Sequence, residues 1–206
     1  MGKKELFWVG IIVSLLVLYV LFHTEEKIVN YPAKNNTIVA FGDSLIEGVG
    51  SSNGGGFIPN TERELNIPII NKGRSGDTTS SAISRLDEVI SLDPGIVMLL
   101  LGGNDILRRI PKEETFKNLG TIIEKLQNNG TLVVLLGVRG GVLTDGYEND
   151  FENLAEEYKT AYLSDVLEKI ITKKDLMSDG IHPNDKGYEV IASRVIPIMK
   201  KVLGKN

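Results

Sequence analysis

The sequence of 206 residues contains no cysteine and only two histidines, His23 and His182. Without cysteine the chain has no disulfide bond, no thiol nucleophile and no thiolate ligand for a metal. Two histidines are also too few for a histidine-rich zinc centre. We therefore expect a protein that uses neither a metal ion nor another cofactor.

Basic residues are outnumbered by acidic ones, and aromatic residues are few. Lysine and arginine number 23 against 27 aspartates and glutamates, which gives a formal net charge of −4, and aromatic residues make up 6% of the chain. A nucleic-acid-binding surface needs clustered basic groups to neutralise phosphates, and binding of single strands also needs aromatic rings on which bases stack. Nucleic acid is therefore excluded as a partner, and the sequence gives no indication of protein partners.

The segment 6–22 is an uncharged, apolar run. As a helix it is roughly 26 Å long, which is close to the thickness of about 30 Å of the hydrocarbon core of a membrane. Lys3 and Lys4 precede it, so the positive-inside rule places residues 1–5 in the cytoplasm. We predict a single-pass signal anchor in the cell membrane, with a short cytoplasmic N-terminus and an extracytoplasmic catalytic domain.

Two other interpretations of this apolar segment are weaker. A cleaved signal peptide, which would leave a secreted protein, needs small residues before the cleavage point, and 19–23 offers none. A helix buried in a soluble core would carry polar positions along one face, whereas Ser14 is the one polar residue of the segment. After the anchor we expect a polar linker over 23–36 and one folded domain over 37–206.

The folded domain alternates apolar strands with amphipathic helices. We predict strands at 37–41, 68–71, 96–101, 132–136 and, more weakly, 161–163, and helices within 82–90, 116–126, 151–158 and 188–202. Continuous apolar runs of this kind are typical of parallel strands that are buried on both faces. The alternation predicts a doubly wound α/β sandwich, in which a functional site is expected beyond the carboxyl ends of the strands.

Polar blocks stand at four such positions. They are Gly42-Asp43-Ser44-Leu45-Ile46-Glu47-Gly48, Asn71-Lys72-Gly73-Arg74-Ser75-Gly76-Asp77-Thr78, Gly102-Gly103-Asn104-Asp105 and Asp179-Gly180-Ile181-His182-Pro183-Asn184. The first three follow predicted strands, and the fourth comes just before the last predicted helix. Taken together and in this order, the four blocks resemble those of the SGNH (GDSL) hydrolases, over most of 37–203.

Similarity to that family suggests a role for each block. Ser44 matches the nucleophile, and Asp179 and His182 match the pair that completes the catalytic triad. Gly76 and Asn104 match residues of the oxyanion hole. The resemblance implies a flavodoxin-like, three-layer α/β/α sandwich with a central parallel sheet of about five strands. It also implies hydrolysis of esters or thioesters by acyl transfer to serine, as in the small lysophospholipase and thioesterase-like members.

The chemistry of these residues points the same way. A serine hydroxyl is a weak nucleophile until a base removes its proton, and His182 is the only histidine beyond the edge of the predicted membrane segment. Asp179, three residues earlier, can accept a hydrogen bond from the imidazole Nδ1–H while Nε2 faces the serine. The N–H groups of Ser44 and Gly76 and the side-chain amide of Asn104 are our candidate donors to the oxyanion.

Each block alone also has a purely structural explanation, because serine, aspartate, asparagine and glycine are common at helix caps and in turns. Arg139 and Tyr147, which follow the strand at 132–136, are predicted from their position alone to touch the substrate. The expected substrate is a small-molecule or lipid ester. The alternatives are a deacetylase of O-acetylated glycans at the cell surface, an acyltransferase, and a catalytically inactive, membrane-tethered binding module.

Overall fold

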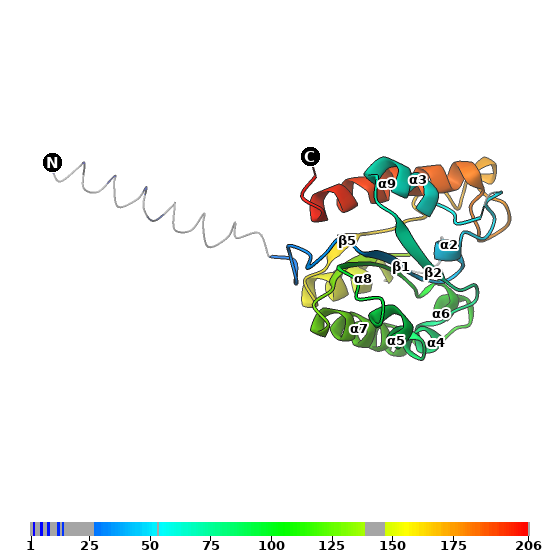
Figure 1. Ribbon diagram of the computed structural model, residues 1–206, viewed down its shortest axis with the longest axis horizontal. Helices are drawn as coiled ribbons and strands as arrows, with labels where there is room; N and C mark the ends of the chain where they lie inside the picture. Colours follow the sequence, from blue (N-terminus) through cyan, green and yellow to red (C-terminus); the bar gives the residue numbers. More distant parts are fainter. Residues whose placement is uncertain are drawn as a thin grey trace.

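The computed structural model describes residues 27–52, 54–138 and 147–205, together with Gly2, Glu5, Trp8, Ile12 and Ser14. Five strands form one sheet in the order β2-β1-β3-β4-β5 (Figure 1). They are β1 (Ile38–Gly42), β2 (Ile69–Gly73), β3 (Ile96–Leu100), β4 (Leu132–Leu136) and β5 (Ala161–Leu163). All neighbouring strands pair in parallel, which confirms the predicted doubly wound sheet.

Helices cover both faces of the sheet and complete the predicted three-layer sandwich. On one face, α3 (Ile58–Leu65) packs against α9 (Asp185–Val202). The other face is covered by α4 (Thr79–Ile83), α5 (Leu86–Ile90), α7 (Lys112–Asn128) and α8 (Tyr147–Glu157) (Figure 1). The short helices α2 (Ser44–Glu47) and α6 (Gly103–Leu107) follow β1 and β3 closely, and a 3₁₀ turn, η1 (Lys174–Leu176), precedes α9.

The three central strands form the middle of the core. Every residue of β1, β3 and β4 is buried, as expected for apolar strands with helices on both sides. At the end of β1, a Cβ on Gly42 would lie 2.2 Å from the carbonyl oxygen of Leu100 on β3. Because only glycine avoids this clash, Gly42 lets β1 keep its register with β3 up to the point where the polar blocks begin.

The prediction of a single helix within 82–90 is wrong, because this segment forms two short helices, α4 and α5. Arg85 stands between the two helices and is only 5% exposed. Its guanidinium donates to the carbonyl oxygens of Lys72 and Gly42, each at 2.9 Å. The break therefore occurs where an arginine side chain turns into the domain and binds the ends of β1 and β2, a contact that the apolar periodicity does not reveal.

Residues 27–36, which were predicted to be part of a linker, are bound to the end of the domain at which the strands begin. Asn30 donates through Nδ2 to the carbonyl oxygen of Gln127, near the end of α7, at 2.9 Å. Asn35 donates through Nδ2 to the carbonyl oxygen of Asp93, in the turn before β3, at 3.0 Å. The chain is therefore attached to the domain before β1 starts, at the end opposite to the carboxyl ends of the strands.

The predicted membrane anchor falls mostly outside the described residues. Of the segment 6–22, the structure describes Trp8, Ile12 and Ser14. Within the part of the chain that is described, no helix combines the length and the apolar character that crossing a membrane requires.

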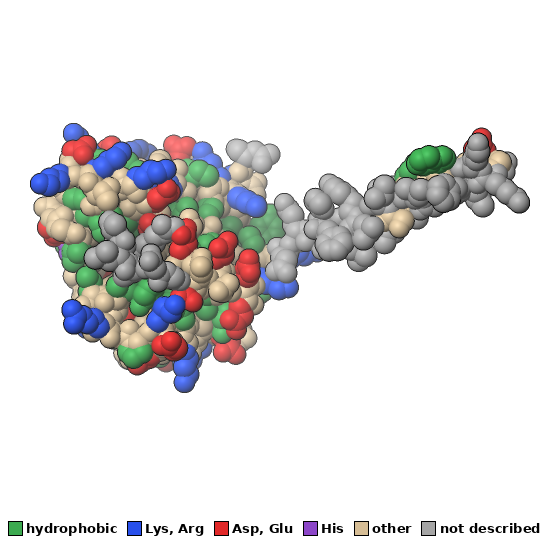
Figure 2. Space-filling model, turned by 180° about the vertical axis from the view of Figure 1, so that it is seen from behind, with side chains coloured by type: hydrophobic (Ala, Val, Ile, Leu, Met, Phe, Trp, Pro, Cys, Tyr) green, Lys and Arg blue, Asp and Glu red, His purple; other side chains and the backbone are tan. Residues whose placement is uncertain are grey.

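The charges on the surface are mixed in sign. On the face shown in Figure 2, lysine and arginine side chains are interspersed with aspartates and glutamates, and they do not gather into a basic stripe on that face. A mixed surface of this kind lacks the clustered positive charge that binding of a phosphate backbone requires.

Candidate active site

Ser44 is the first residue of α2, directly beyond the carboxyl end of β1. Asp43 caps this helix, because its carboxylate accepts the N–H of Leu45 at 3.0 Å. Ser44 is only 8% exposed, and its N–H lies in the first turn of a helix, where backbone donors have no partner within the helix. The strand–helix junction thus presents a hydroxyl and a backbone donor of the same residue.

His182 links this hydroxyl to a carboxylate. Its Nε2 lies 3.0 Å from Ser44 Oγ, and its Nδ1 lies 2.8 Å from Asp179 Oδ2. Both distances are in the range expected for a nucleophile, a base and a group that orients the base. The structure therefore brings together three predicted site residues, one from the start of α2 and two from a loop that lies far away in the sequence.

The loop that carries Asp179 and His182 is folded around the Asp179 carboxylate. Oδ1 of Asp179 accepts the backbone N–H groups of Ile181 at 2.8 Å and of His182 at 2.7 Å. Directly after the loop, Asn184 caps α9 by accepting the N–H of Gly187 at 3.2 Å. The spacing of three residues between aspartate and histidine is thus a closed turn, in which one carboxylate holds both the backbone and the imidazole.

Two carboxyl groups near His182 have opposite pKa shifts. The hydrogen bond from His182, followed by the one from the Ile181 N–H, lowers the pKa of Asp179 to about 2. Burial raises the pKa of Asp43 to about 7, although the Leu45 N–H and the nearby His182 act in the other direction. Asp179 is therefore charged at neutral pH and favours the tautomer with the proton on Nδ1 of the imidazole, whereas Asp43 exchanges its proton near neutrality.

The predicted oxyanion-hole residues border one cavity with the nucleophile. Ser44, Gly76, Asn104 and His182 all line a cavity of about 190 Å³. Within the described residues, the N–H groups of Ser44 and Gly76 have no hydrogen-bond acceptor. The Asn104 amide donates one N–H to the carbonyl oxygen of Asp77 at 3.0 Å, and its second N–H remains for a ligand. The three candidate oxyanion donors therefore belong to residues that border the same cavity.

The rest of the cavity wall is mainly apolar. Its aliphatic side chains are those of Leu45, Leu107, Val138, Leu167, Ile171 and Ile181. Leu107 and Ile181 are 57% and 42% exposed, so they stand at the rim. The sequence interpretation missed Leu167 and Ile171, which lie in the irregular stretch after β5. The available signal was a group of apolar residues just beyond the carboxyl end of a predicted strand.

Of the two residues predicted to touch the substrate, Tyr147 lies within the described residues and is not among those that line the cavity. Arg139 lies outside the described residues. Tyr147 is the first residue of α8, and its ring packs against Phe116, with a centroid separation of 5.8 Å, and beside the Lys112 ammonium group, 5.9 Å from the ring centroid. A contact between either residue and a substrate stays a prediction.

The groups of the site are suited to acyl transfer. Among the residues that the structure describes, no cluster of three or more histidine, aspartate or glutamate side chains is arranged to hold a metal ion. The cavity instead offers a hydroxyl, an imidazole with a carboxylate behind it, and several N–H donors. These are the components of a serine nucleophile with a preformed oxyanion hole.

Residues 40–190 match the GDSL-like Lipase/Acylhydrolase family. The chain belongs to this family. An arylesterase of Vibrio mimicus is 31% identical over 149 residues, which are 69% of this chain and 74% of that protein. Esterase TesA of Pseudomonas aeruginosa is 27% identical over 183 residues, which are 83% of this chain and 91% of that protein.

Solved structures of esterases share the fold. A crystal structure of TesA has a TM-score of 0.76 and 27% identity, and covers 81% of this chain and 99% of that one. Esterase EstA from Pseudoalteromonas sp., in a structure inhibited by monoethylphosphonate, has a TM-score of 0.75 and 27% identity, and covers 83% of this chain and all of that one. The GDSL family member described here is thus an SGNH serine esterase or acylhydrolase acting on ester bonds, which confirms the family and activity predicted from the four blocks.

Proposed function

We propose that this hydrolase cleaves carboxylic esters through an acyl-enzyme on Ser44, with His182 as the base and Asp179 as the group that orients it. The observation that carries the proposal is the continuous hydrogen-bonded path from Ser44 Oγ through both ring nitrogens of His182 to Asp179, with distances of 3.0 and 2.8 Å. The N–H donors of residues that border the same cavity can bind the oxyanion that forms when Ser44 attacks an ester.

In the acylation step, Ser44 Oγ attacks the carbonyl carbon of the ester while its proton passes to Nε2 of His182. The carbonyl oxygen becomes an oxyanion and accepts hydrogen bonds from the N–H groups of Ser44 and Gly76 and from the Asn104 amide. His182 then gives its proton to the departing alcohol or thiol as the bond to the acyl carbon breaks. In the second half of the cycle a water molecule attacks the acyl-serine, with His182 again as the base, and the carboxylic acid leaves.

The size and lining of the cavity indicate the acyl group. Its volume of about 190 Å³ is below the roughly 300–1,000 Å³ of pockets that enclose drug-sized ligands. A short or medium acyl chain fits against Leu167 and Ile171, and a longer chain crosses the rim at Leu107 and Ile181. We therefore propose that simple short-chain esters and thioesters are the preferred substrates, and that lysophospholipids are processed with part of the chain outside the cavity.

We also propose that the domain works outside the cytoplasm, held at the cell membrane by the segment 6–22. The apolar run and the lysines before it support this placement, and secretion after cleavage is the alternative. The full-length chain is expected to fractionate with membranes, and a variant that begins at Lys27 is expected to be soluble and active. Protease added to intact cells is expected to degrade the domain; protection of the domain would contradict the proposed topology.

The test of the activity is a series of nitrophenyl esters from acetyl to palmitoyl, assayed beside lysophospholipids and acetylated glycans. The wild type is expected to turn over the short esters and to be labelled by a fluorophosphonate. Ser44→Ala is expected to lose the label and to fall in kcat by about 10⁶-fold with its fold intact. Labelling at another serine would reject Ser44, and a preference for acetylated glycans would favour a deacetylase.

A further inference from the structure

The segment that carries the oxyanion glycine is bound by two side chains one turn apart on and just after α6. The Arg108 guanidinium donates through Nη2 to the carbonyl oxygen of Gly76 at 2.8 Å. The Asn104 amide donates to the carbonyl oxygen of the next residue, Asp77, at 3.0 Å. Residues four positions apart lie on the same side of a helix, so two successive carbonyl groups of this segment are directed to the same part of α6.

A buried ion pair holds the same segment from the other side. The Asp77 carboxylate pairs with Nε of Arg85 at 2.5 Å, and both side chains are almost completely buried. Arg85 also donates to the carbonyl oxygens of Gly42 and Lys72. Gly42 is the last residue of β1, two positions before Ser44, so Asp77 is fixed relative to the strand end that carries the nucleophile.

Gly76 itself supplies no rigidity. Its φ is 80°, and glycine adopts positive and negative φ about equally readily because it has no Cβ. Its N–H, the expected oxyanion donor, has no acceptor within the described residues. A donor to an oxyanion must be placed to within about 0.5 Å and 10–20° of its productive position. Contacts from outside the glycine must therefore select its orientation.

We infer that Arg108 is a positioning residue for the oxyanion hole: by binding the Gly76 carbonyl oxygen, it fixes the orientation of the loop that presents the Gly76 N–H. The inference rests on the esterase mechanism proposed above. Arg108 does not line the cavity, whereas its neighbour Leu107 does. The guanidinium lies against the loop, 3.4 Å from where a Cβ on Gly76 would be. It therefore acts through the loop and not by contact with the substrate.

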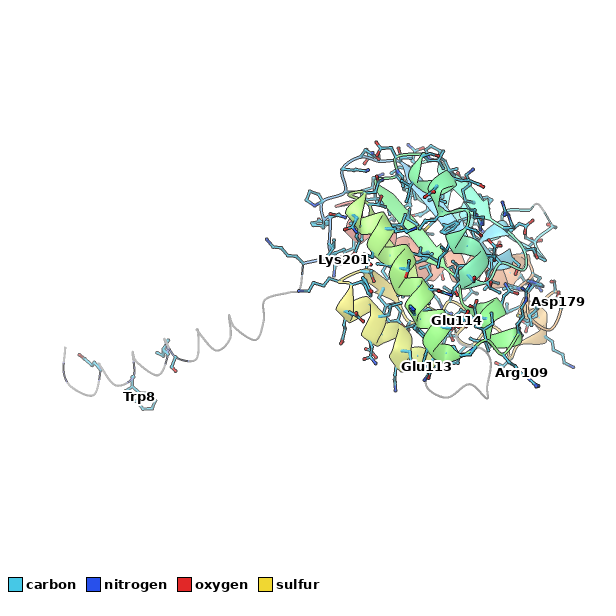
Figure 3. All side chains as sticks on the ribbon, turned by 90° about the horizontal axis from the view of Figure 1, so that it is seen from below. Trp8, Arg109, Glu113, Glu114, Asp179 and Lys201 are labelled. Carbon is cyan, nitrogen blue, oxygen red and sulfur yellow. The ribbon has the colours of Figure 1, made fainter. Side chains whose placement is uncertain are left out.

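The experiment compares Arg108→Met with Arg109→Met. Both residues are exposed arginines at the end of α6, but the Arg109 side chain forms no ion pair or hydrogen bond within the described residues and points away from the domain (Figure 3). Steady-state kinetics on nitrophenyl acetate give kcat and KM. A trifluoromethyl ketone, which adds to serine and places an oxyanion in the hole, gives an inhibition constant for a mimic of the tetrahedral state. Thermal melts show that each variant is folded.

Arg108→Met is expected to lower kcat about tenfold, which is less than the 10²–10³-fold loss that follows deletion of an entire oxyanion donor. The KM is expected to stay within about twofold, as for an interaction that acts in the transition state alone. The inhibition constant of the ketone is expected to rise by the same factor as kcat/KM falls, and Arg108→Lys is expected to recover part of both. Arg109→Met is expected to match the wild type.

Two results would overturn the inference. One is equal kinetics for Arg108→Met and Arg109→Met. The other is a loss confined to KM with an unchanged inhibition constant of the ketone, which would make Arg108 a substrate contact. Both presuppose an active wild type that a fluorophosphonate labels. If the wild type shows neither turnover nor label, the esterase mechanism fails, and with it the role of Arg108.

Discussion

Asp179 binds His182 through both of its carboxylate oxygens: Oδ1 accepts the backbone N–H at 2.7 Å, and Oδ2 lies 2.8 Å from Nδ1 of the ring. One side chain thus closes the turn and orients the imidazole. The two tasks fall on different atoms of the side chain. One oxygen is enough to accept the backbone N–H, whereas orienting the ring needs the second atom to be an acceptor for Nδ1–H as well. A substitution at Asp179 can separate them.

Asp179→Asn is expected to preserve the turn and to impair catalysis. An amide oxygen can still accept the two backbone N–H groups, but the amide nitrogen then faces Nδ1 and favours the wrong tautomer of the imidazole. We expect kcat to fall by about 10⁴-fold, compared with about 10⁶-fold for His182→Ala. Steady-state kinetics on nitrophenyl acetate measure both. If Asp179→Asn retains wild-type activity, another group orients the imidazole.

Asp43 is expected to make the stability of the fold depend on pH. Burial raises the pKa of this carboxyl from an ordinary 3.8 to about 7, with Asp77 and Asp105 acting in the same direction and the Leu45 N–H and His182 opposing them. The folded protein therefore holds the proton more tightly than the unfolded chain does. The contribution of Asp43 to the free energy of unfolding is complete below about pH 4 and is lost as the pH rises through about 7.

Asp43→Asn keeps the helix cap and removes this titration. Urea unfolding of the wild type and the variant at about pH 4 and about pH 8 measures the effect. We expect the wild type to lose stability relative to the variant between the two pH values. Parallel pH profiles for the two proteins would show that Asp43 has the same pKa in the folded and unfolded states.

Arg85→Met is expected to destabilise the fold, because it leaves the Asp77 carboxylate buried and unpaired. Breaking a buried ion pair from one side costs about 3–5 kcal/mol. The double change Arg85→Met with Asp77→Leu is expected to recover part of the loss, since it removes both charges of this pair. Lys200→Met, which breaks the exposed pair with Glu64, is the control in urea unfolding and is expected to have little effect. Equal losses for Arg85→Met and Lys200→Met would contradict the expectation.

Ile171→Trp is expected to shorten the acyl chains that the enzyme accepts. Ile171 lines the cavity, and a larger ring there takes up space beside the acyl chain. We expect kcat/KM for octanoyl and longer nitrophenyl esters to fall at least about tenfold. One methylene group in an apolar pocket already changes kcat/KM by about 10–200-fold. The kcat/KM for the acetyl ester is expected to be unaffected. Ile70→Trp, at a position on β2 that is 38% exposed, is the matched control. A uniform loss over all chain lengths would place the acyl chain elsewhere.

The sheet, and the meeting of Ser44, Asp179 and His182 in one place, were predictable because short sequence patterns indicate both. The strand β1 is an apolar run that ends directly at Asp43 and Ser44, and β3 ends close to Asn104 in the same way. In a parallel sheet the carboxyl ends of strands meet at one edge, so residues that follow different strands are brought together by topology alone. The order of the blocks was therefore enough to predict that Ser44, Gly76 and Asn104 border one cavity.

Other parts depend on contacts between distant residues and leave no such record. An arginine in an amphipathic pattern is normally interpreted as facing solvent. Nothing in the neighbouring sequence therefore indicated that Arg85 would divide a helix, or that it would bind the carbonyl oxygen of the distant Gly42. Leu167 and Ile171 follow β5 in a stretch without helical or strand periodicity, so their position after a strand was the one signal of their part in the cavity wall. The sequence periodicity records how a segment alternates between core and solvent, but not which polar group a buried side chain will meet.

The attachment of residues 27–36 places the start of the described chain away from the proposed catalytic residues. Asn30 and Asn35 bind the end of the sheet at which the strands begin, whereas Ser44 and the loop of Asp179 and His182 lie beyond the opposite end. Figure 3 shows Asp179 far from Lys201, which is near the end of α9. A bead or a fused protein joined at Lys27 is therefore expected to lie nearer to the starts of the strands than to Ser44. Immobilisation through the N-terminal end of this segment is therefore expected to leave the approach to Ser44 unobstructed.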